Sequence, residues 1–482
     1  MGINDIEIAN DIETLRQIAL ALWRENERLK TELARLREQV EHGRKRRHGR
    51  SSERRKRKSP KAKNPKSSEP KRGHGPTPQP RLQVETEHVT LSEERTCAYC
   101  DGTFGPIDGM TEDSEVVTVI ERRFVVKQVK RQKYRCRCGI GLITAPAPLK
   151  LIPGGRYSLE FAIHVAVEKY LMHMPLARQC RDMQRRGLVT TTQVLYDQIE
   201  ALARVWQPVY QLLPQYQLGY DVVGMDETGW LVMQKGSPSK RWWVWSITTP
   251  DAAFYHIAPS RGAAVAASLL GDFNGIVVCD GYSAYQSLAK QRSDFRLALC
   301  WSHVRRKFFE AEPNHPTCSE ALDLIGELFQ IDRDTADPAR LAGDDKLAAS
   351  AARMQARQER APSILAKLLD WAKQQRGLPK SGLRRAIDYM VKHWDSLRAF
   401  LEDPFVPLDN NASERALRTV VLGRKNHYGS RSQRGTEVAA LFYSILETAV
   451  LNGLDPSQYM REATRALLDG APPRSVLPIA RH

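Results

Sequence analysis

Two apolar runs that each lead into an aspartate, GYDVVGMDET (219–228) and GIVVCD (275–280), decide the fold of this chain. Both runs are short, contain paired valines and are bounded by glycine, which is typical of buried strands. Three further strand patterns lie between them, namely TGWLVMQK, across a tight turn from the first run, then KRWWVWSITT and AAFYHIAPS. An Ala-rich helix is expected at 262–271, directly before GIVVCD. The order predicts three antiparallel strands, a helical crossover and then a parallel strand.

The pattern KRWWVWSITT is apolar on both faces, because Trp242 and Trp243 point to opposite sides of the strand. A strand of this kind is central in its sheet and covered by helices on both faces. Together with the strand order, this predicts an α/β core with a ribonuclease-H-like sheet. In that topology Asp226 and Asp280 become neighbours in space.

A third acidic residue, Glu414, lies just inside a helix start in PLDNNASERALR (407–418). Two divalent cations, Mg²⁺ or Mn²⁺, held about 3.5–4 Å apart by carboxylates can activate an attacking oxygen and stabilise a leaving one. We expect Asp226 to bridge the two ions, with Asp280 and Glu414 each completing one side. Such a site performs phosphoryl transfer on nucleic acid.

Single residues of this set also have simpler interpretations. A lone aspartate at a strand end is more often a turn or cap residue, and Glu414 precedes Arg418 at the spacing of a favourable surface ion pair. The basic residues that follow Glu414 favour a metal ligand beside a phosphate path over a solvated helix face. Glu227 is left out of the site, because alternation along the strand turns it to the opposite face.

A long insertion separates Asp280 from Glu414, and its middle part (about 319–402) is rich in helix patterns. The last of them, SGLRRAIDYMVKHWDSLRAFLED (381–403), is expected to be a single helix that Pro404 ends. Ahead of it, LALCWSHVRRKFFE places Cys300 and His303 three residues apart. They are either a metal pair or structural residues close to the active site, and we favour the structural role. His303 as a general base is a weaker alternative.

Charge and composition indicate several domains and a polyanionic partner. The chain has 482 residues and a net charge of +17, and residues 44–72 hold fifteen Lys or Arg against two Glu, so 15 − 2 = +13 lies in one block. Such a block is usually disordered and binds polyanions by releasing counterions, the alternative being a solubilising tail. No apolar stretch approaches a membrane span, the acidic N-terminus predicts no leader peptide, and the few cysteines predict a reducing compartment. We expect a cytoplasmic, nucleoid-associated bacterial protein.

The N-terminal segment 8–40 follows a heptad register. Core position d of the heptad is Ile8 and then leucine at 15, 22, 29 and 36. Core position a is aliphatic at 12, 19, 33 and 40 and is Asn26 in between. Leucine at d with a lone Asn at a favours a parallel dimer of fixed register. Glu25 and Glu32 at g face Lys30 and Arg37 at e of a partner helix. We predict a homodimer or higher assembly through this coiled coil, the alternative being an amphipathic helix packed on its own domain.

Two cysteine pairs, Cys97 with Cys100 and Cys136 with Cys138, flank a strand-like stretch. Four thiolates around a β-hairpin predict a structural Zn²⁺ site of the zinc-ribbon type. The second pair is C-x-C rather than C-x-x-C, so four free thiols in a small β-domain is the alternative. Residues 158–205 then read as three short helices, and Arg178, Arg181, Arg185 and Arg186 lie on the middle one. This pattern fits a helix-turn-helix DNA-binding motif and an ordinary helical connector equally well.

Taken jointly, the motifs resemble the large transposase of the IS66 family of bacterial insertion sequences over nearly the whole chain. Beside the zipper and the cysteine pairs they are HGRSSER, EKYLMHMPLARQ, MDET, CDGY, CWSHVRRKF, DNNASERALR, GRKN and ILETAVLNGLDP. The resemblance implies a DDE transposase with its triad on Asp226, Asp280 and Glu414. It also implies nicking at the element end, attack of the released 3′-hydroxyl on target DNA, a zinc-binding module that contacts DNA, and small accessory proteins. HYGSRS after GRKN departs from the family pattern, so we expect recognition of the DNA ends to differ from that of the family.

The expected organisation, given by residue range, is a coiled coil (5–42), a basic disordered linker (43–80), a cysteine-rich zinc-ribbon-like module (81–150), a helical DNA-binding region (151–212), a ribonuclease-H-like catalytic core (213–298 and 405–430), an α-helical insertion (299–404) and a C-terminal helical tail (431–482). The candidate DNA contacts are Arg44, Lys45, Arg46, Arg47, Arg54, Arg55, Lys56, Arg57, Arg181, Arg185, Arg415, Arg418, Arg424 and Lys425. Two other functions compete with the transposase, a non-catalytic DNA-binding protein and a structure-specific nuclease of the same fold.

Overall fold

The computed structural model describes residues 12–48, 123–135, 142–233 and 241–479. The chain divides into two compact units, one of residues 1–53 with 124–482 and one of residues 54–123, and almost all described residues belong to the first. Helix α2 (Ile12–His48) is continuous and includes the first basic residues that the sequence assigned to the linker. Whether α2 pairs with a second copy stays a prediction.

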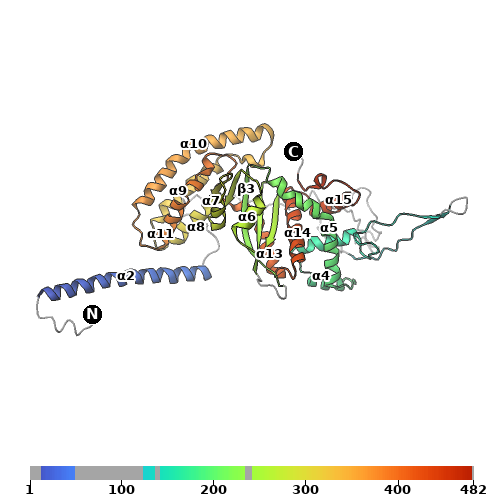
Figure 1. The fold of residues 1–482 in the computed structure, drawn as a ribbon, viewed down its shortest axis with the longest axis horizontal. Helices are drawn as coiled ribbons and strands as arrows, with labels where there is room; N and C mark the ends of the chain where they lie inside the picture. Colours follow the sequence, from blue (N-terminus) through green and yellow to red (C-terminus); the bar gives the residue numbers. More distant parts are fainter. Residues whose placement is uncertain (1–11, 49–122, 136–141, 234–240, 480–482) are drawn as a thin grey trace, which may run out of the picture. The chain divides into compact units, whose positions relative to one another are not determined.

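A five-stranded mixed sheet forms the centre of the α/β region (Figure 1). Its strands, in the order in which they lie side by side, are β5 (Ala253–Ala258), β4 (Arg241–Thr248), β3 (Val222–Leu231), β6 (Ile276–Cys279) and β7 (Arg296–Leu299). The first three are antiparallel, and β6 and β7 continue the sheet in parallel with β3. The strand order is consistent with a ribonuclease-H-like core. The tight turn expected between MDET and GWLV is absent, because Val222–Leu231 pairs with β4 as one uninterrupted strand.

Helices cover both faces of the sheet. Helices α13 (Asn411–His427) and α14 (Gln433–Leu451) lie on one face, where Ser444 accepts a hydrogen bond from the backbone of Tyr255 in β5. Helices α6 (Ala263–Leu270) and α7 (Ser283–Gln291) belong to the other face, where Tyr285 packs edge-on against Trp245. Since α14 is buried along most of its length, it is a core helix and not the tail that the sequence suggested.

The helices before the sheet pack with the last helix of the chain. They are α3 (Leu159–Tyr170), α4 (Leu176–Arg185) and α5 (Thr192–Gln217), and the last is α15 (Pro456–Leu468), followed by η3 (Pro473–Val476). Trp206 of α5 donates to Thr464 of α15 over 2.9 Å, and both side chains are buried. Among the described residues no single helix is long and apolar enough to cross a membrane, although α14 and α15 together, strongly bent, meet the limits of length and composition.

The insertion between β7 and α13 is helical, as expected. Its elements are α8 (Trp301–Ala311), α9 (Cys318–Arg333), η1 (Pro338–Arg340), α10 (Gly343–Gln374), α11 (Gly382–Lys392), α12 (Trp394–Leu397) and η2 (Ala399–Leu401). The long helix α10 runs through Pro362 without a break. The single helix expected up to Pro404 is instead divided at His393, whose side chain is buried beside Gln286 of α7.

Candidate active site

The register of the sheet brings the first two acids to the place where the parallel pairing of β3 with β6 ends. In the parallel pair of β3 and β6, Gly224 lies opposite Val278. Asp226 and Asp280 each follow their member of this pair by two residues. The carboxyl ends of parallel strands are where open α/β sheets bind their ligands. Backbone pairing alone therefore sets the spacing of these two carboxylates.

Asp226 carries the electrostatic signature of an acidic cluster. Its pKa is raised to about 7, chiefly by burial. The charges of Glu227, Asp280 and Glu414 also raise this pKa, whereas a hydrogen bond from the Glu227 backbone lowers it. The carboxylates of Asp280 and Glu414 are thus near enough to oppose ionisation of Asp226. Such clusters with shifted pKa values are typical of functional sites.

Glu414 reaches the site because the start of α13 is bound to β3 through buried side chains. Asn410 donates from its side chain to the Met225 carbonyl over 2.9 Å. Ser413 shares a 2.7 Å hydrogen bond with Thr248 and donates to Asn410 over 2.7 Å. Both Asn410 and Ser413 are nearly inaccessible to water. Glu414, directly after Ser413, lies in the first turn of α13, next to the strand that carries Asp226.

The pair in CWSHVRRKF supports this helix start as well. Cys300 accepts a hydrogen bond from the Asn410 backbone over 3.2 Å and is almost fully buried. His303 places Nε2 3.8 Å from Oε1 of Glu414, whereas its buried Nδ1 has no partner among the described residues. Cys300 is therefore a structural residue beside the site, and His303 is a direct neighbour of the third acid.

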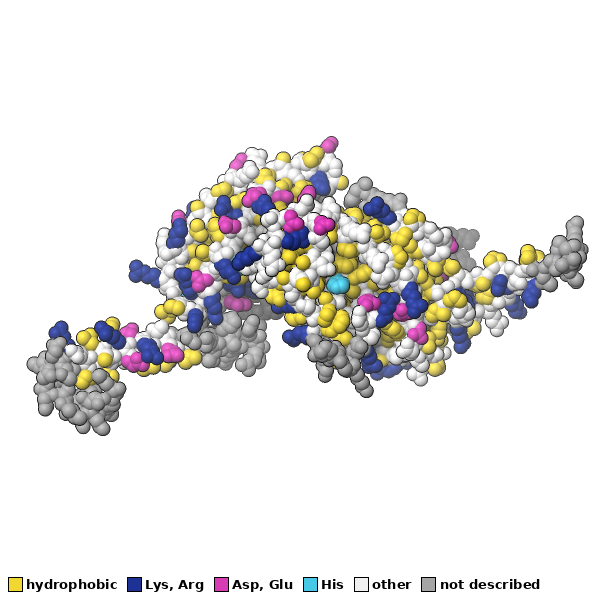
Figure 2. Space-filling view, viewed as in Figure 1, with side chains coloured by type: hydrophobic (Ala, Val, Ile, Leu, Met, Phe, Trp, Pro, Cys, Tyr) yellow, Lys and Arg dark blue, Asp and Glu magenta, His cyan; other side chains and the backbone are white. Residues whose placement is uncertain are grey.

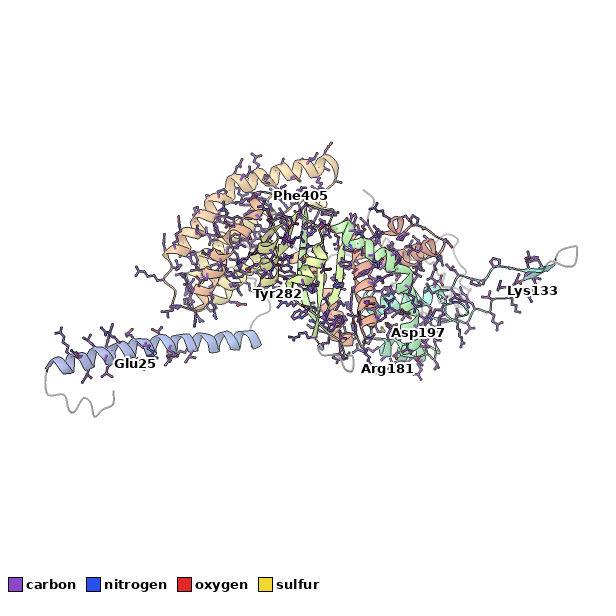
Figure 3. All side chains as sticks on the ribbon, viewed as in Figure 1. Glu25, Lys133, Arg181, Asp197, Tyr282 and Phe405 are labelled. Carbon is purple, nitrogen blue, oxygen red and sulfur yellow. The ribbon has the colours of Figure 1, made fainter. Side chains whose placement is uncertain are left out.

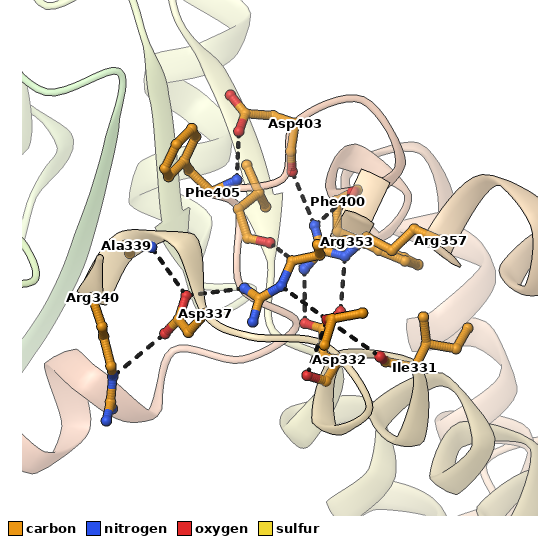
Figure 4. Close-up of polar contacts among 12 residues, drawn as sticks. Ile331, Asp332, Asp337, Ala339, Arg340, Arg353, Arg357, Phe400, Asp403 and Phe405 are labelled. Atoms are coloured by element: carbon orange, nitrogen blue, oxygen red, sulfur yellow. Dashed lines mark hydrogen bonds and ion pairs between the residues drawn. The ribbon is translucent and has the colours of Figure 1, made fainter. Parts of the chain in front are cut away.

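The helical insertion holds the two chain segments on either side of the site. Arg357 of α10 is completely buried, pairs through two nitrogens with Asp332 of α9, and donates to the carbonyls of Phe400, Asp403 and Val406 (Figure 4). This network fixes the segment that leads into α13. At the other side, a Cβ on Gly281 would lie 2.4 Å from the hydroxyl of Tyr389 in α11. Only glycine therefore allows α11 to approach the residue after Asp280 so closely.

The three acids are chemically suitable ligands for a hard divalent cation. Asp226, Asp280 and Glu414 offer carboxylate oxygens, which Mg²⁺ and Mn²⁺ prefer. A bound cation would offset the repulsion that raises the pKa of Asp226. In the described part of the chain, however, no three or more His, Cys, Asp or Glu side chains are already arranged closely enough to hold a metal ion. Asp226 and Asp280 each accept a hydrogen bond from a nearby backbone N–H, of Glu227 and Tyr282 respectively.

The cysteine site lies outside the described residues. Strands β1 (Lys133–Arg135) and β2 (Leu142–Thr144) form a small antiparallel hairpin, and Cys136 and Cys138 fall between them in the sequence. Cys97 and Cys100 also belong to the part that is not described. The zinc site stays a prediction.

The predicted DNA contacts are distributed over several elements. Arg181 and Arg185 are exposed on α4, where Arg178 extends the same face at helical spacing (Arg181 is labelled in Figure 3). The basic residues 44–47 lie in α2 but their side chains are outside the description, as are residues 54–57. On the face seen in Figure 2, Lys and Arg side chains alternate with acidic ones and form no single patch.

The basic residues of α13 divide into two kinds. Arg415, Arg418 and Lys425 are exposed on the outer side of the helix. Arg424 is half-buried and donates to the Gly229 carbonyl of β3. The first three are free to meet a phosphate path, whereas Arg424 ties α13 to the sheet.

Glu227 belongs to a cluster that the sequence analysis set aside. It does point away from Asp226, but its side chain is fully buried and binds Arg261 and Tyr285. The signal was present in the sequence, since a glutamate in a strand that is apolar on both faces needs a buried partner. Its partners, however, lie far along the chain.

Comparison with known proteins identifies the family. The sequence profile described as Transposase IS66 family matches residues 154–438, which span the first helices, the sheet, the insertion and α13. The chain belongs to this family. As an IS66-family DDE transposase it is a polynucleotidyl transferase that acts in DNA transposition and binds DNA.

Two relatives from Sinorhizobium fredii extend the similarity beyond the profile. Uncharacterized protein y4jD is 31% identical over 421 residues, which cover 83% of this chain and 79% of the relative. Uncharacterized protein y4hP is 28% identical over 414 residues, which cover 80% of this chain and 73% of the relative. The IS66 transposase therefore resembles these proteins over most of its length.

Proposed function

We propose that this transposase cleaves DNA at the ends of its element and joins the released 3′-hydroxyl to target DNA, using Asp226, Asp280 and Glu414 as its catalytic acids. The observation that carries the proposal is the raised pKa of Asp226, about 7, to which burial contributes most and the nearby charges of Glu227, Asp280 and Glu414 contribute further. When bound there, two Mg²⁺ or Mn²⁺ ions would supply activation of the attacking oxygen and charge stabilisation for the leaving oxygen.

The protein's own contribution is position and charge. Asp226 and Asp280 are fixed by strand pairing, and Glu414 by the hydrogen bonds of Asn410 and Ser413. The backbone positions of the three acids are thus fixed before DNA arrives, and preorganisation of this kind lowers the barrier of the chemical step. Water attacks the phosphodiester in the first step, and the new 3′-hydroxyl attacks target DNA in the second, so the same site serves both.

The test uses full-length protein and labelled duplexes that carry the inverted repeats flanking the gene. With Mg²⁺ or Mn²⁺ the protein should nick the element end, and Asp280→Asn should lower the rate by about 10³-fold or more while leaving DNA binding intact. Asp272→Asn is the matched control, since Asp272 is exposed after α6 and should cut like the wild type. Nicking by Asp280→Asn at the wild-type rate would contradict the proposal. A pre-cut end separates the transposase from a nuclease, because a nuclease does not join it to target DNA.

The remaining predictions concern how the enzyme holds DNA. We propose that Cys97, Cys100, Cys136 and Cys138 bind Zn²⁺ and that the surrounding module contacts DNA. We also propose that the protein assembles through α2, because Leu22, Leu29 and Leu36 at core position d and Leu33 at core position a are each about half exposed along that helix. The proposed DNA contacts are the basic residues 44–47 at the end of α2 and 54–57 after it, Arg181 and Arg185 on α4, and Arg415, Arg418 and Lys425 on α13. Small accessory proteins of the element are proposed partners. The protein would act at the nucleoid.

A further inference from the structure

The face of β3 opposite Asp226 contains a buried ion pair that the proposed reaction does not use. The Glu227 side chain is 0% exposed. It accepts hydrogen bonds from Nε and Nη2 of Arg261, at 2.9 and 2.6 Å, and from the hydroxyl of Tyr285, at 2.6 Å. Because a buried carboxylate without partners would be strongly destabilising, these three contacts make its burial tolerable.

Arg261 is held between two aromatic rings as well as by Glu227. Its guanidinium carbon lies 3.8 Å from the ring centre of Tyr282 and 4.7 Å from that of Trp243 in β4. The Tyr282 hydroxyl in turn donates to the Arg261 carbonyl over 3.1 Å. The guanidinium is thus fixed in position and orientation before any ligand arrives.

This fixed cation lies close to Asp280, one of the proposed catalytic acids. Tyr282, which stacks on Arg261 and is labelled in Figure 3, donates its backbone N–H to Asp280 over 2.9 Å. Asp280 is close enough to interact electrostatically with Arg261. The Arg261 side chain is 36% exposed, and in the described part of the chain Nη1 has no hydrogen-bond acceptor. Its remaining donors are therefore available at the edge of the site.

We propose that Arg261 binds a backbone phosphate of the DNA beside the scissile bond, and that Glu227 is the residue that positions it. The inference deepens the proposed function and rests on it. Three carboxylates repel a polyanion, so a fixed cation at their edge favours the approach of a phosphate. A guanidinium matches the two non-bridging oxygens of a phosphate in shape and hydrogen-bond direction, which a lysine ammonium does not.

A purely structural ion pair is the alternative, and it predicts a different outcome. If the pair only stabilised the sheet, loss of Arg261 would lower the free energy of unfolding but would affect every DNA substrate alike. If Arg261 contacts a phosphate, the loss of nicking rate in Arg261→Gln depends on whether that one phosphate is charged. The experiment therefore changes the protein and the DNA separately and together.

The experiment is a methylphosphonate scan of the element end with full-length protein. Each duplex carries one uncharged phosphate near the scissile bond, and single-turnover nicking is measured for wild type and for Arg261→Gln. We expect Arg261→Gln to nick the unmodified duplex about 100-fold more slowly. At one phosphate, neutralisation should slow the wild type by a similar factor and slow Arg261→Gln no further, because both changes remove the same contact.

Three variants accompany the scan. Arg261→Lys should stay at least about tenfold slow, because an ammonium cannot replace the paired donors. Arg261→Gln alone leaves the buried Glu227 carboxylate unpaired and can prevent folding. In that case the double variant Glu227→Gln with Arg261→Gln, which removes both charges of the pair, supplies folded protein for the scan. Arg296→Gln is the control, since Arg296 forms an exposed ion pair with Glu402 and should nick like the wild type.

The outcomes separate this inference from the proposed function. If every neutralised phosphate slows Arg261→Gln by the same factor as the wild type, Arg261 contacts none of them and the inference is overturned. If the wild type does not nick the unmodified duplex, the proposed function fails. In that case the dissociation constant of each duplex is measured instead. A phosphate whose neutralisation weakens binding by the wild type but not by Arg261→Gln still supports the contact. If no phosphate behaves in this way, the inference is overturned.

Discussion

The two strand acids and the helix acid of this transposase are held by different kinds of interaction. Asp226 and Asp280 take their places from main-chain pairing between β3 and β6. Glu414 depends on side chains, through Asn410 and Ser413 at its own helix start. Main-chain pairing tolerates most substitutions, whereas a buried side-chain network fails when one partner is lost. Glu414 is therefore the most vulnerable of the three acids.

The helical insertion contacts the chain beside Asp280 and the segment before Glu414, and the second set of contacts is the more extensive. At Asp280 it contributes a close packing contact between Gly281 and Tyr389. Before Glu414 it contributes the buried charge network of Arg357, which holds three carbonyls of the approaching segment. Damage to the insertion should therefore disturb Glu414 more than the strand acids.

The largest effect is expected from Arg357→Met, which breaks this network. The change leaves Asp332 without its buried partner and three carbonyls without donors, so the free energy of unfolding should fall by about 3–5 kcal/mol. Chemical denaturation measures the loss, and hydrogen exchange should rise in residues 400–427 while the amides of β3 and β6 stay protected.

Arg360→Met is the matched control for that change. Arg360 lies one helical turn further on α10 and forms an exposed ion pair with Asp334, so its loss should cost at most about 1 kcal/mol. Equal losses in the two variants would show that the insertion does not secure the segment before Glu414.

A smaller effect is expected from Gly224→Ala, which tests the contact between β3 and α13 directly. An added Cβ would lie 2.4 Å from the hydroxyl of Ser413 and 2.5 Å from that of Thr248. We expect a loss of about 1–3 kcal/mol of stability and, because Glu414 moves with α13, a fall in nicking rate of about 10- to 100-fold. Denaturation and single-turnover nicking measure the two quantities.

Gly326→Ala serves as its control, since a Cβ at this position in α9 meets nothing within 4 Å. Alanine favours a helix over glycine by about 0.5–1 kcal/mol, so this variant should be as stable as the wild type or slightly more so. A Gly224→Ala protein with wild-type stability and activity would mean that α13 does not depend on this contact.

The smallest effect concerns the pH dependence of the strand acids. The pKa of Asp226 is raised from an ordinary 3.8 to about 7, by burial and by Glu227, Asp280 and Glu414. A carboxyl whose folded pKa lies above its unfolded pKa stabilises the fold at low pH, and this contribution is lost as the pH rises through the folded value. The metal-free wild type should therefore become less stable between about pH 4 and pH 7 through this group.

Asp226→Asn removes that charge at every pH. Without divalent ions it should be more stable than the wild type by about 2 kcal/mol near pH 8, and it should not nick DNA. Thermal unfolding at several pH values measures the difference, and Mg²⁺ should raise the Tm of the wild type more than that of the variant. A wild-type Tm that is independent of pH and of Mg²⁺ would contradict the acidic cluster.

Sequence patterns predicted the sheet well where periodicity carried the information. The strands around Asp226 and Asp280 and the helix that begins before Glu414 were recognisable from apolar runs, glycines and helix starts. The division of Val222–Leu231 into two strands was wrong, because Thr228 and Gly229 resemble a turn locally and only pairing with β4 keeps them extended. The break at His393 was missed for a similar reason, since the contact with Gln286 of α7 lies far along the chain.

The amino-acid sequence alone sets the available chemistry: one carboxylate on a strand, one directly after a strand and one in the first turn of a helix, in a strongly basic chain with the motifs of its family. Local order is encoded locally, in the spacing of apolar residues and in the residues that begin and end helices. Only the tertiary structure decided which side chains complete the site. Glu227 with Arg261, Asn410 with Met225, and Arg357 with Val406 meet because the sheet and the insertion fold together. Contacts between such distant residues leave no periodic signal in the chain, and their energies arise only once burial removes water from both partners.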